Sequence, residues 1–166
     1  NYQHLKSQVT DLNYTAGNKW KFNASNKAVK IKNGVFPTAA NQSQDFAVEI
    51  DGANDIQSVC GVSAIIFNVF SPFDMVPWRN TYPGTPLYGS DNVCGPTRRW
   101  NFQFNTLTQA KRIAAVNFLD LIPDGYYVTA RYTSGTINTA IYADVWANDT
   151  LVMGTGNSLY HRLKDA

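Results

Sequence analysis

Residues 107–133, LTQAKRIAAVNFLDLIPDGYYVTARYT, predict a helix, a turn and a strand in direct succession. The apolar residues of the first half recur at the spacing of one helix face, as Leu107, Ala110, Ala114, Phe118 and Leu121, with Ile113, Val116 and Leu119 beside them. We expect the hydroxyl of Thr106 or Thr108 to cap the first turn. Pro123 lacks an amide donor and ends the helix, and the Asp-Gly pair after it is typical of a turn. Apolar and polar residues then alternate from 126 to 133, which predicts a strand.

The composition is typical of an ordered extracellular domain. Its 166 residues suffice for a core, so we expect residues 1–166 to form a single domain. Only 16% of residues are charged whereas 13% are aromatic, which argues against disorder. The net charge is +2, and the lysines near the N-terminus alternate along strand-like segments, which favours a solvated face over an anion-binding patch. We expect no nucleic-acid partner. No apolar run reaches the roughly 18 residues of a membrane span, so we expect no such span.

Further strands are expected on both sides of the opening stretch. Three short candidates lie at 19–23, 28–32 and 46–50, and the apolar run 62–70 predicts a buried central strand. Residues 100–105 alternate apolar and polar side chains, which predicts a strand that is buried on one face only. Asn157 or Ser158 is expected to cap a last helix. Many strands and one long helix favour a mainly β (α+β) fold, a two-sheet antiparallel sandwich with one long and one or two short flanking helices.

A long loop at residues 71–98, here called the aromatic loop, is the candidate recognition surface. A loop of this length in a compact domain is usually functional or cross-linked. Aromatic and arginine side chains stack on sugar rings and occupy the centres of protein interfaces. We therefore predict a ligand-binding surface, for a glycan or a cell-surface protein, formed by Trp78, Arg79, Tyr82, Tyr88 and Trp100, with Arg98 and Arg99 nearby. The alternative is that these rings only pack the loop onto the domain.

Cys60 and Cys94 are the two cysteines of the chain. In an asparagine-rich chain with few charges they favour one disulfide bond over two free thiols. On the chain-entropy model this bond would stabilise the domain by about 3.5–4 kcal/mol. It would join the start of the predicted central strand to the aromatic loop. A thiol nucleophile is a further alternative, but no histidine lies nearby in the sequence to activate it.

The sequence contains no catalytic, cofactor-binding or metal-binding motif. The two histidines, His4 and His161, lie near opposite ends and have no companion ligands at zinc-site spacing. Most aspartates adjoin glycine, asparagine or proline, which predicts turn residues rather than paired catalytic carboxylates. This interpretation covers Asp51, Asp55, Asp74, Asp91, Asp124, Asp144 and Asp149, of which all but Asp74 and Asp144 have such a neighbour. We therefore expect a module that is not an enzyme and uses no cofactor or metal.

Several segments of the chain resemble one known family. They are SNKAVKIKNG at 25–34, DFAVEIDG at 45–52, GVSAIIFNVFSPFD at 61–74, IPDGYYVTARYTSG at 122–135 and GNSLYHRLKDA at 156–166. Together with the helix between them, they are similar to the interleukin-like EMT-inducer domain. They most resemble its version in large bacterial proteins exported by the type IX system, often alongside gingipain-type cysteine peptidase domains. The turn Ile-Pro-x-Gly-x-x-Val is the most specific of these motifs.

The resemblance implies a sandwich of two antiparallel sheets with short flanking helices and no catalytic residues of its own. Family members continue past the last helix into one more strand, so we expect a fragment of a larger secreted protein that lacks this strand. We predict a non-catalytic accessory or binding module, for adhesion or for glycan or protein binding, in a secreted or cell-surface bacterial protein, next to other domains of its parent chain. The alternatives are a non-catalytic fragment of a gingipain-type cysteine peptidase and a purely structural spacer.

Overall fold

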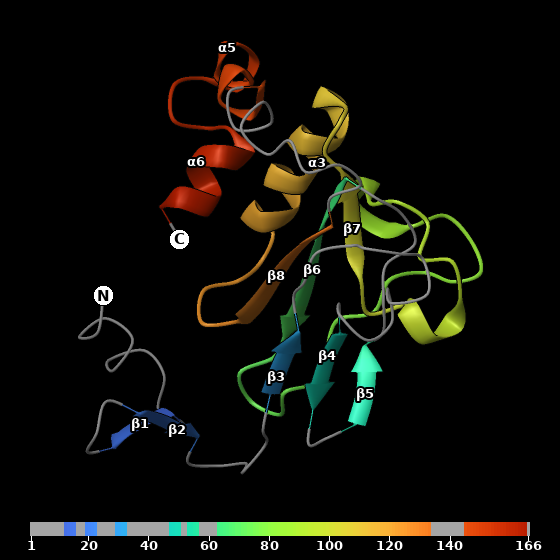
Figure 1. The fold of residues 1–166 in the computed structure, drawn as a ribbon, viewed down its shortest axis with the longest axis vertical. Helices are drawn as coiled ribbons and strands as arrows, with labels where there is room; N and C mark the ends of the chain where they lie inside the picture. Colours follow the sequence, from blue (N-terminus) through green and yellow to red (C-terminus); the bar gives the residue numbers. More distant parts are fainter. Residues whose placement is uncertain are drawn as a thin grey trace.

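The computed structural model describes residues 12–15, 19–22, 29–32, 47–50, 53–56, 63–133 and 145–165. These residues form a mixed α+β fold with short helices and a three-stranded antiparallel sheet (Figure 1). Within the described ranges, no helix has the length and apolar character needed to cross a membrane.

The central sheet is built around β6, Ala64–Phe70, which lies between β7, Phe102–Asn105, and β8, Tyr127–Thr133. Both neighbours are antiparallel to β6, and Phe67 of β6 is paired with a residue of each. All 7 residues of β6 are buried. The prediction of a central strand within 62–70 is therefore confirmed, since a strand covered on both faces needs apolar residues at successive positions.

The predicted helix, turn and strand are present as α3, Gln109–Asp120, a tight turn and β8. In the turn, the amide of Tyr126 donates to the carbonyl oxygen of Pro123 at 3.3 Å. Gly125 has a φ of 88° in this turn, a left-handed conformation that glycine adopts without a steric penalty. The sequence motif thus determines where the chain reverses from α3 onto the sheet.

The buried side of α3 differs from the predicted stripe. Arg112, Ala115, Val116 and Phe118 are the buried residues of the helix. Leu107, Ala110 and Leu121 are exposed, so their placement on the buried stripe was wrong. Leu107 precedes the helix and Leu121 follows it, while the inward position of Arg112 turns Ala110 toward solvent.

The predicted hydroxyl cap of α3 was also wrong. Thr108 is the N-cap residue, but its side chain makes no capping hydrogen bond. The hydroxyl of Thr106 instead donates to the carbonyl oxygen of Ser63 at 2.8 Å. This bond ties the entry of α3 to the residue that precedes β6.

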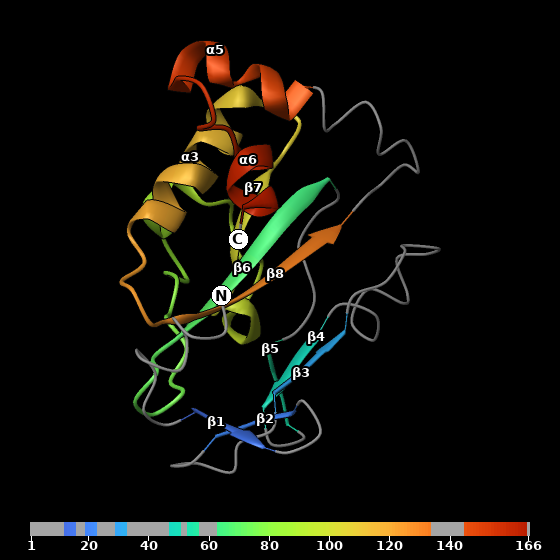
Figure 2. The ribbon, with the colours of Figure 1, turned by 90° about the vertical axis from the view of Figure 1, so that its left-hand side faces the viewer.

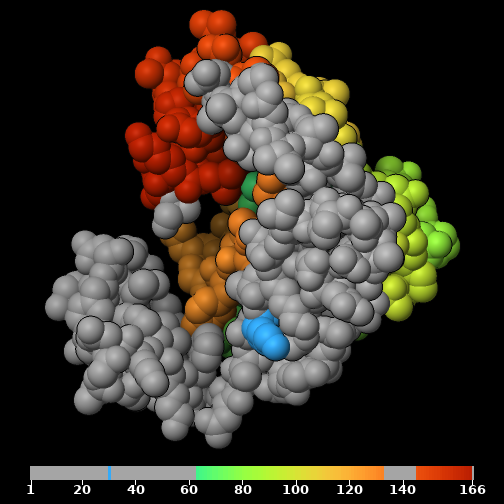
Figure 3. Space-filling view, viewed as in Figure 1, coloured from blue at the N-terminus to red at the C-terminus, as the bar shows by residue number. Residues whose placement is uncertain are grey.

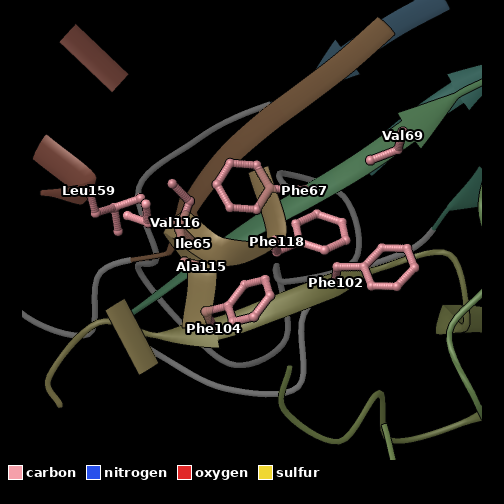
Figure 4. Packing of buried hydrophobic residues seen from close by; sticks show 9 residues of the cluster. All are labelled: Ile65, Phe67, Val69, Phe102, Phe104, Ala115, Val116, Phe118 and Leu159. Atoms are coloured by element: carbon pink, nitrogen blue, oxygen red, sulfur yellow. The ribbon is translucent and has the colours of Figure 1, made fainter. Parts of the chain in front are cut away.

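The core lies between the central sheet and the helices (Figure 4). The Phe118 ring of α3 stacks on Phe102 of β7 with centroids 4.7 Å apart, and its centroid is 5.9 Å from that of Phe67. Burial of a side chain of this size stabilises the fold by about 1.5–3 kcal/mol. The cluster comprises Ile65, Phe67, Val69, Phe102, Phe104, Ala115, Val116, Phe118 and Leu159.

Short helices follow β8 near the end of the chain. They are α5, Thr150–Met153, and α6, Leu159–Lys164, with a further helical turn at 145–148. Helix α6 contacts α3 and lies on the same side of the sheet (Figure 2). Ser158 caps α6 by accepting a hydrogen bond from the amide of His161 at 3.4 Å, which confirms one of the two predicted caps.

The N-terminal strands form two small antiparallel sheets. In one, β1, Leu12–Thr15, pairs with β2, Lys19–Phe22, and in the other the order is β3, Val29–Lys32, β4, Ala47–Ile50, and β5, Ala53–Ile56. β2, β3 and β4 confirm the three predicted strands. In Figure 2, β3–β5 lie on the side of the central sheet away from α3.

Two N-terminal strands, β1 and β5, were not predicted. β5 contains Asp55, which was expected in a turn. Pairing with β4 outweighs the low strand preference of its Asn-Asp sequence. The only described side chain among β1–β5 is that of Lys30, which reaches the surface as the blue atoms of Figure 3. The other lysine side chains of the predicted solvated face lie outside the described residues.

The prediction that the strand at 100–105 is buried on one face only was wrong. Phe102 and Phe104 are buried on the helix side, and Gln103, which lies between them and points to the opposite face, is buried as well. Asn101, just before β7, is also buried. At β6 and β7 the sheet is therefore covered on both faces, and Asn68, Thr129 and Arg131 of its second face form hydrogen bonds within the protein.

Candidate functional site

The aromatic loop continues directly from the central strand. The amide of Trp78 donates to the carbonyl oxygen of Val69 at 2.9 Å, and Pro77 forms a β-bridge with Phe70. Two short 3-10 turns follow, η2, Leu87–Gly89, and η3, Pro96–Arg98. The loop thus folds back along the end of β6. Part of it, green to yellow-green, forms the right-hand margin of Figure 3.

Asn80 holds the middle of the loop. Its Nδ2 donates to the Ser90 hydroxyl at 2.9 Å and to the carbonyl oxygen of Asn101 at 3.1 Å. Its Oδ1 accepts from the amides of Thr81 at 2.9 Å and Leu87 at 2.8 Å. A side-chain amide has two donors and two acceptor positions, so this buried group is fully satisfied.

The loop also covers the outer edge of β7. The amide of Asp91 donates to the carbonyl oxygen of Gln103 at 2.7 Å, and the Asp91 carboxylate accepts from the amide of Asn105 at 2.6 Å. The same carboxylate forms an ion pair with Lys111 at 2.8 Å. Because an exposed strand edge invites pairing with other chains, the loop both protects β7 and is held by it. Asp91 was expected only as a turn residue.

The structure divides the predicted contact residues into two groups. Trp78 is partly buried against the core, with its ring centroid 6.5 Å from Phe102 and 6.3 Å from Phe118. Tyr88 lies 6.3 Å from the Trp78 ring and stays 46% exposed. Trp78 and Tyr88 thus extend the core to the surface. For Trp78, this contact agrees with the alternative that the ring packs the loop onto the domain.

The second group lies where residues 79–80 run beside residues 99–100. The amide of Asn80 donates to the carbonyl oxygen of Arg99 at 2.5 Å. The Arg79 guanidinium carbon lies 5.8 Å from the ring centroid of Trp100, a cation–π distance. Tyr82, two residues after Asn80, is 37% exposed. In this group Arg79 and Tyr82 are exposed and Trp100 is half-buried; together with Tyr88 they form the outward-facing part of the predicted surface.

A buried polar network lies on the face of the sheet opposite α3. Asn68 accepts from the hydroxyl of Thr129 at 3.1 Å and from Arg131 Nη2 at 2.9 Å. Asn68 Nδ2 donates to Asn101 Oδ1 at 2.8 Å and to the carbonyl oxygen of Trp100 at 2.9 Å. Burial lowers the pKa of Arg131 to about 10, and the side chain is 1% exposed. The network therefore stabilises the sheet and does not contact a ligand in solution.

A buried ion pair joins α3 to the C-terminal helices. The Asp149 carboxylate accepts from Arg112 Nε at 2.6 Å, from Arg112 Nη2 at 2.8 Å and from Gln109 Nε2 at 3.0 Å. Arg112 Nη1 donates to the carbonyl oxygen of Thr106 at 2.8 Å. Burial raises the pKa of Asp149, but hydrogen bonds from Arg112 and Gln109 and the charge of Arg112 outweigh it, so the pKa lies below its ordinary value.

Asp149 lies in a turn as predicted, but its buried ion pair with Arg112 was not predicted. The ion pair is structural because both side chains are buried, at 4% exposure for Arg112 and 1% for Asp149. One sequence feature could have indicated it: Arg112 lies one helical turn before Ala115 and Val116, on the apolar side of α3. No comparable feature marks Asn80 among the many asparagines of the chain.

Ser158 and His161 form the contact most similar to a nucleophile–base pair. The Ser158 hydroxyl lies 2.8 Å from His161 Nδ1. Ser158 is 0% exposed and caps α6, so its oxygen is inaccessible to a substrate. The described ranges hold no group of three or more histidine, cysteine or acidic residues that could bind a metal ion. His4 lies outside the described residues.

An apolar hollow of about 330 Å³ lies between β8 and the helices. It is lined by Phe67, Leu119, Asp120, Val128, Ala130, Arg162 and Leu163. Its charged residues, Asp120 and Arg162, pair with each other at 3.1 Å. The hollow is therefore lined mainly by apolar side chains, with one ion pair among its lining residues.

Cys94 is the one cysteine among the described residues, and it is not a free thiol. Its sulfur lies 3.8 Å from the carbonyl oxygen of Asn92. Cys60 lies outside the described residues, so the Cys60–Cys94 disulfide stays a prediction.

No family model, curated protein or solved structure matches this chain. The resemblance to the interleukin-like EMT-inducer domain therefore stays a prediction.

Proposed function

We propose that this chain is a binding module of a secreted or cell-surface protein and that the aromatic loop presents its ligand-binding surface. The observation that carries the proposal is the combination of exposed rings with a fixed backbone. Tyr82 and Tyr88 are exposed, while the four hydrogen bonds of Asn80 hold the loop between them. A surface that is already ordered loses little conformational entropy when it binds a ligand.

Backbone strain in the loop supports the same proposal. Met75, Tyr88 and Cys94 have φ values of 58°, 57° and 55°, in the left-handed region. Each such residue other than glycine costs about 1–2 kcal/mol, and strain of this kind gathers where function requires a particular backbone shape. A loop that only connected two strands would not need three residues in this unfavourable backbone conformation.

Trp78 is not the residue to test, although it belongs to the predicted surface. Its packing against Phe102 and Phe118 means that a Trp78→Ala variant would lose core contacts as well as any ligand contact. We assign contact with the ligand to Arg79, Tyr82, Tyr88 and Trp100, and support of the loop to Trp78.

We further propose that the domain is a two-sheet sandwich of the interleukin-like EMT-inducer type, from a bacterial protein exported by the type IX system. Ile66, Asn68, Phe70 and Arg131 are buried on the sheet face opposite α3, so a second layer covers that face. The sheet of β3, β4 and β5 lies on that side (Figure 2), and β5 contacts η3. The proposal predicts that removal of residues 1–60 exposes this face and unfolds the chain.

The binding function is tested with an array that carries neutral, carboxylated and sulfated glycans. We expect the full chain to bind a subset of them and the Tyr82→Ala variant to lose that binding. Phe73→Ala is the matched control, because Phe73 is a ring at 87% exposure outside the assigned surface. Retention of no glycan by the wild-type chain, or equal retention by both variants, would refute the glycan-binding function.

A structural spacer is the second candidate. It is favoured by one observation, the packing of Trp78 and Tyr88 on the core, since rings used only for packing need no ligand. A spacer predicts that Tyr82→Ala, Phe73→Ala and the wild-type chain behave alike in every binding assay. A fragment of a gingipain-type peptidase predicts instead that peptide cleavage appears only in the parent protein.

A further inference from the structure

Three arginines at the contact surface have no carboxylate partner within the described residues. By contrast, Lys111, Arg112 and Arg162 each form an ion pair with an aspartate. Arg79 instead lies over the Trp100 ring, and Arg99 Nε donates to the carbonyl oxygen of Pro96 at 3.1 Å. Arg98 Nε is buried without a hydrogen-bond partner. The site therefore gathers positive charge that the described part of the protein leaves uncompensated.

The backbone brings these residues together from distant parts of the sequence. The hydrogen bond from Asn80 to Arg99 sets residues 79–80 beside residues 99–100, and Arg79 thereby reaches Trp100. Arg98 belongs to η3, directly before this pair. One aromatic ring and the guanidinium over it thus lie next to two further cationic residues.

We propose that Arg79 and Trp100, with Arg98 and Arg99, bind a saccharide that carries carboxylate or sulfate groups. This inference rests on the proposed glycan-binding function and names its ligand class. A guanidinium donates two parallel hydrogen bonds that match the oxygens of a carboxylate or a sulfate. The Trp100 ring supplies a flat apolar surface for the C–H face of a sugar. A neutral glycan would leave the arginines unpaired, and an acidic peptide would make less use of the ring.

The proposal is tested by titration of the full chain with four probes. They are oligogalacturonate for carboxylates, heparin-derived oligosaccharides for sulfates, chito-oligosaccharides as neutral sugars and polyglutamate as an acidic peptide. We expect the carboxylated or the sulfated sugar to bind most tightly, and the stronger of the two identifies the anionic group. Binding should weaken as salt rises, because exposed charges are screened over about 8 Å at physiological ionic strength.

Arg79→Gln is the test variant and Lys164→Gln is the control, which removes the same charge from an exposed position on α6. Loss of a charge-assisted contact should weaken acidic-sugar binding by about tenfold or more in Arg79→Gln. The control should bind like the wild-type chain. Equal weakening in both variants, or equal binding of polyglutamate, would overturn the assignment of an acidic-sugar site.

The outcome separates this inference from the function on which it rests. Binding of chito-oligosaccharides alone would overturn the acidic-sugar assignment and leave the glycan-binding function standing. Absence of binding to every saccharide probe and to the glycan array would overturn both. Binding of an acidic sugar that depends on Arg79 supports both.

Discussion

The buried ion pair between Arg112 and Asp149 gives the sharpest prediction for stability. The Asp149→Asn change keeps the size of the side chain but removes its charge, and the Arg112 guanidinium is then buried without a counter-ion. Breaking a buried pair by removal of one partner costs about 3–5 kcal/mol. For a domain of this size each kcal/mol shifts Tm by about 2–4 °C, so we expect Tm to fall by about 6–20 °C.

The assay is thermal and urea unfolding of the full chain, monitored by tryptophan fluorescence and circular dichroism. Asp120→Asn is the matched control, because Asp120 pairs with Arg162 at the surface, with side chains 51% and 43% exposed. An exposed pair contributes about 0–1 kcal/mol. If Asp149→Asn unfolds at the same urea concentration as Asp120→Asn, the assignment of a stabilising buried pair is refuted.

Three further predictions concern the loop, pH and the cysteines. Asn80→Ala should lower the free energy of unfolding by about 1–3 kcal/mol and speed amide hydrogen exchange at Leu87, whereas unchanged exchange would show that Asn80 does not hold the loop. Because the pKa of Asp149 is lowered, its contribution to the stability of the fold is complete above the ordinary carboxyl pKa of about 3.9 and is lost as pH falls through the folded-state pKa. Between pH 6 and pH 2, the urea midpoint should therefore fall less in Asp149→Asn than in the wild-type chain. Parallel profiles of the two proteins would contradict this prediction. Peptide mass spectrometry of the non-reduced protein should find Cys60 joined to Cys94, and two alkylated free thiols would reject the bond.

Residue periodicity predicts the elements that pack against the core. The apolar run of β6, the helix of α3 and the alternation of β8 are each determined by local sequence, and Gly125 reverses the chain between the last two. For β6 and α3, local preference and burial favour the same structure. In β8 the polar residues Thr129 and Arg131 are buried, whereas the apolar residue Val128 is exposed. Element type is therefore predictable even where the exact buried face of α3 is not.

The polar contacts that shape the site are not predictable in this way. Arg112 and Asp149 are 37 residues apart, and Arg131 and Asn68 are 63 apart. Whether a polar side chain is buried with a partner depends on which distant residue the fold brings beside it. The same reason explains why Trp78 and Trp100 have similar sequence surroundings but different roles, since Trp78 meets Phe118 whereas Trp100 meets Arg79.

The central claim is that the aromatic loop is an ordered surface for a glycan ligand. Isothermal titration of the most strongly retained array glycan against the wild-type chain and Tyr82→Ala tests it most directly. We predict that Kd rises about tenfold or more in Tyr82→Ala and stays unchanged in Phe73→Ala, with both variants folded. An unchanged Kd in folded Tyr82→Ala would contradict the account.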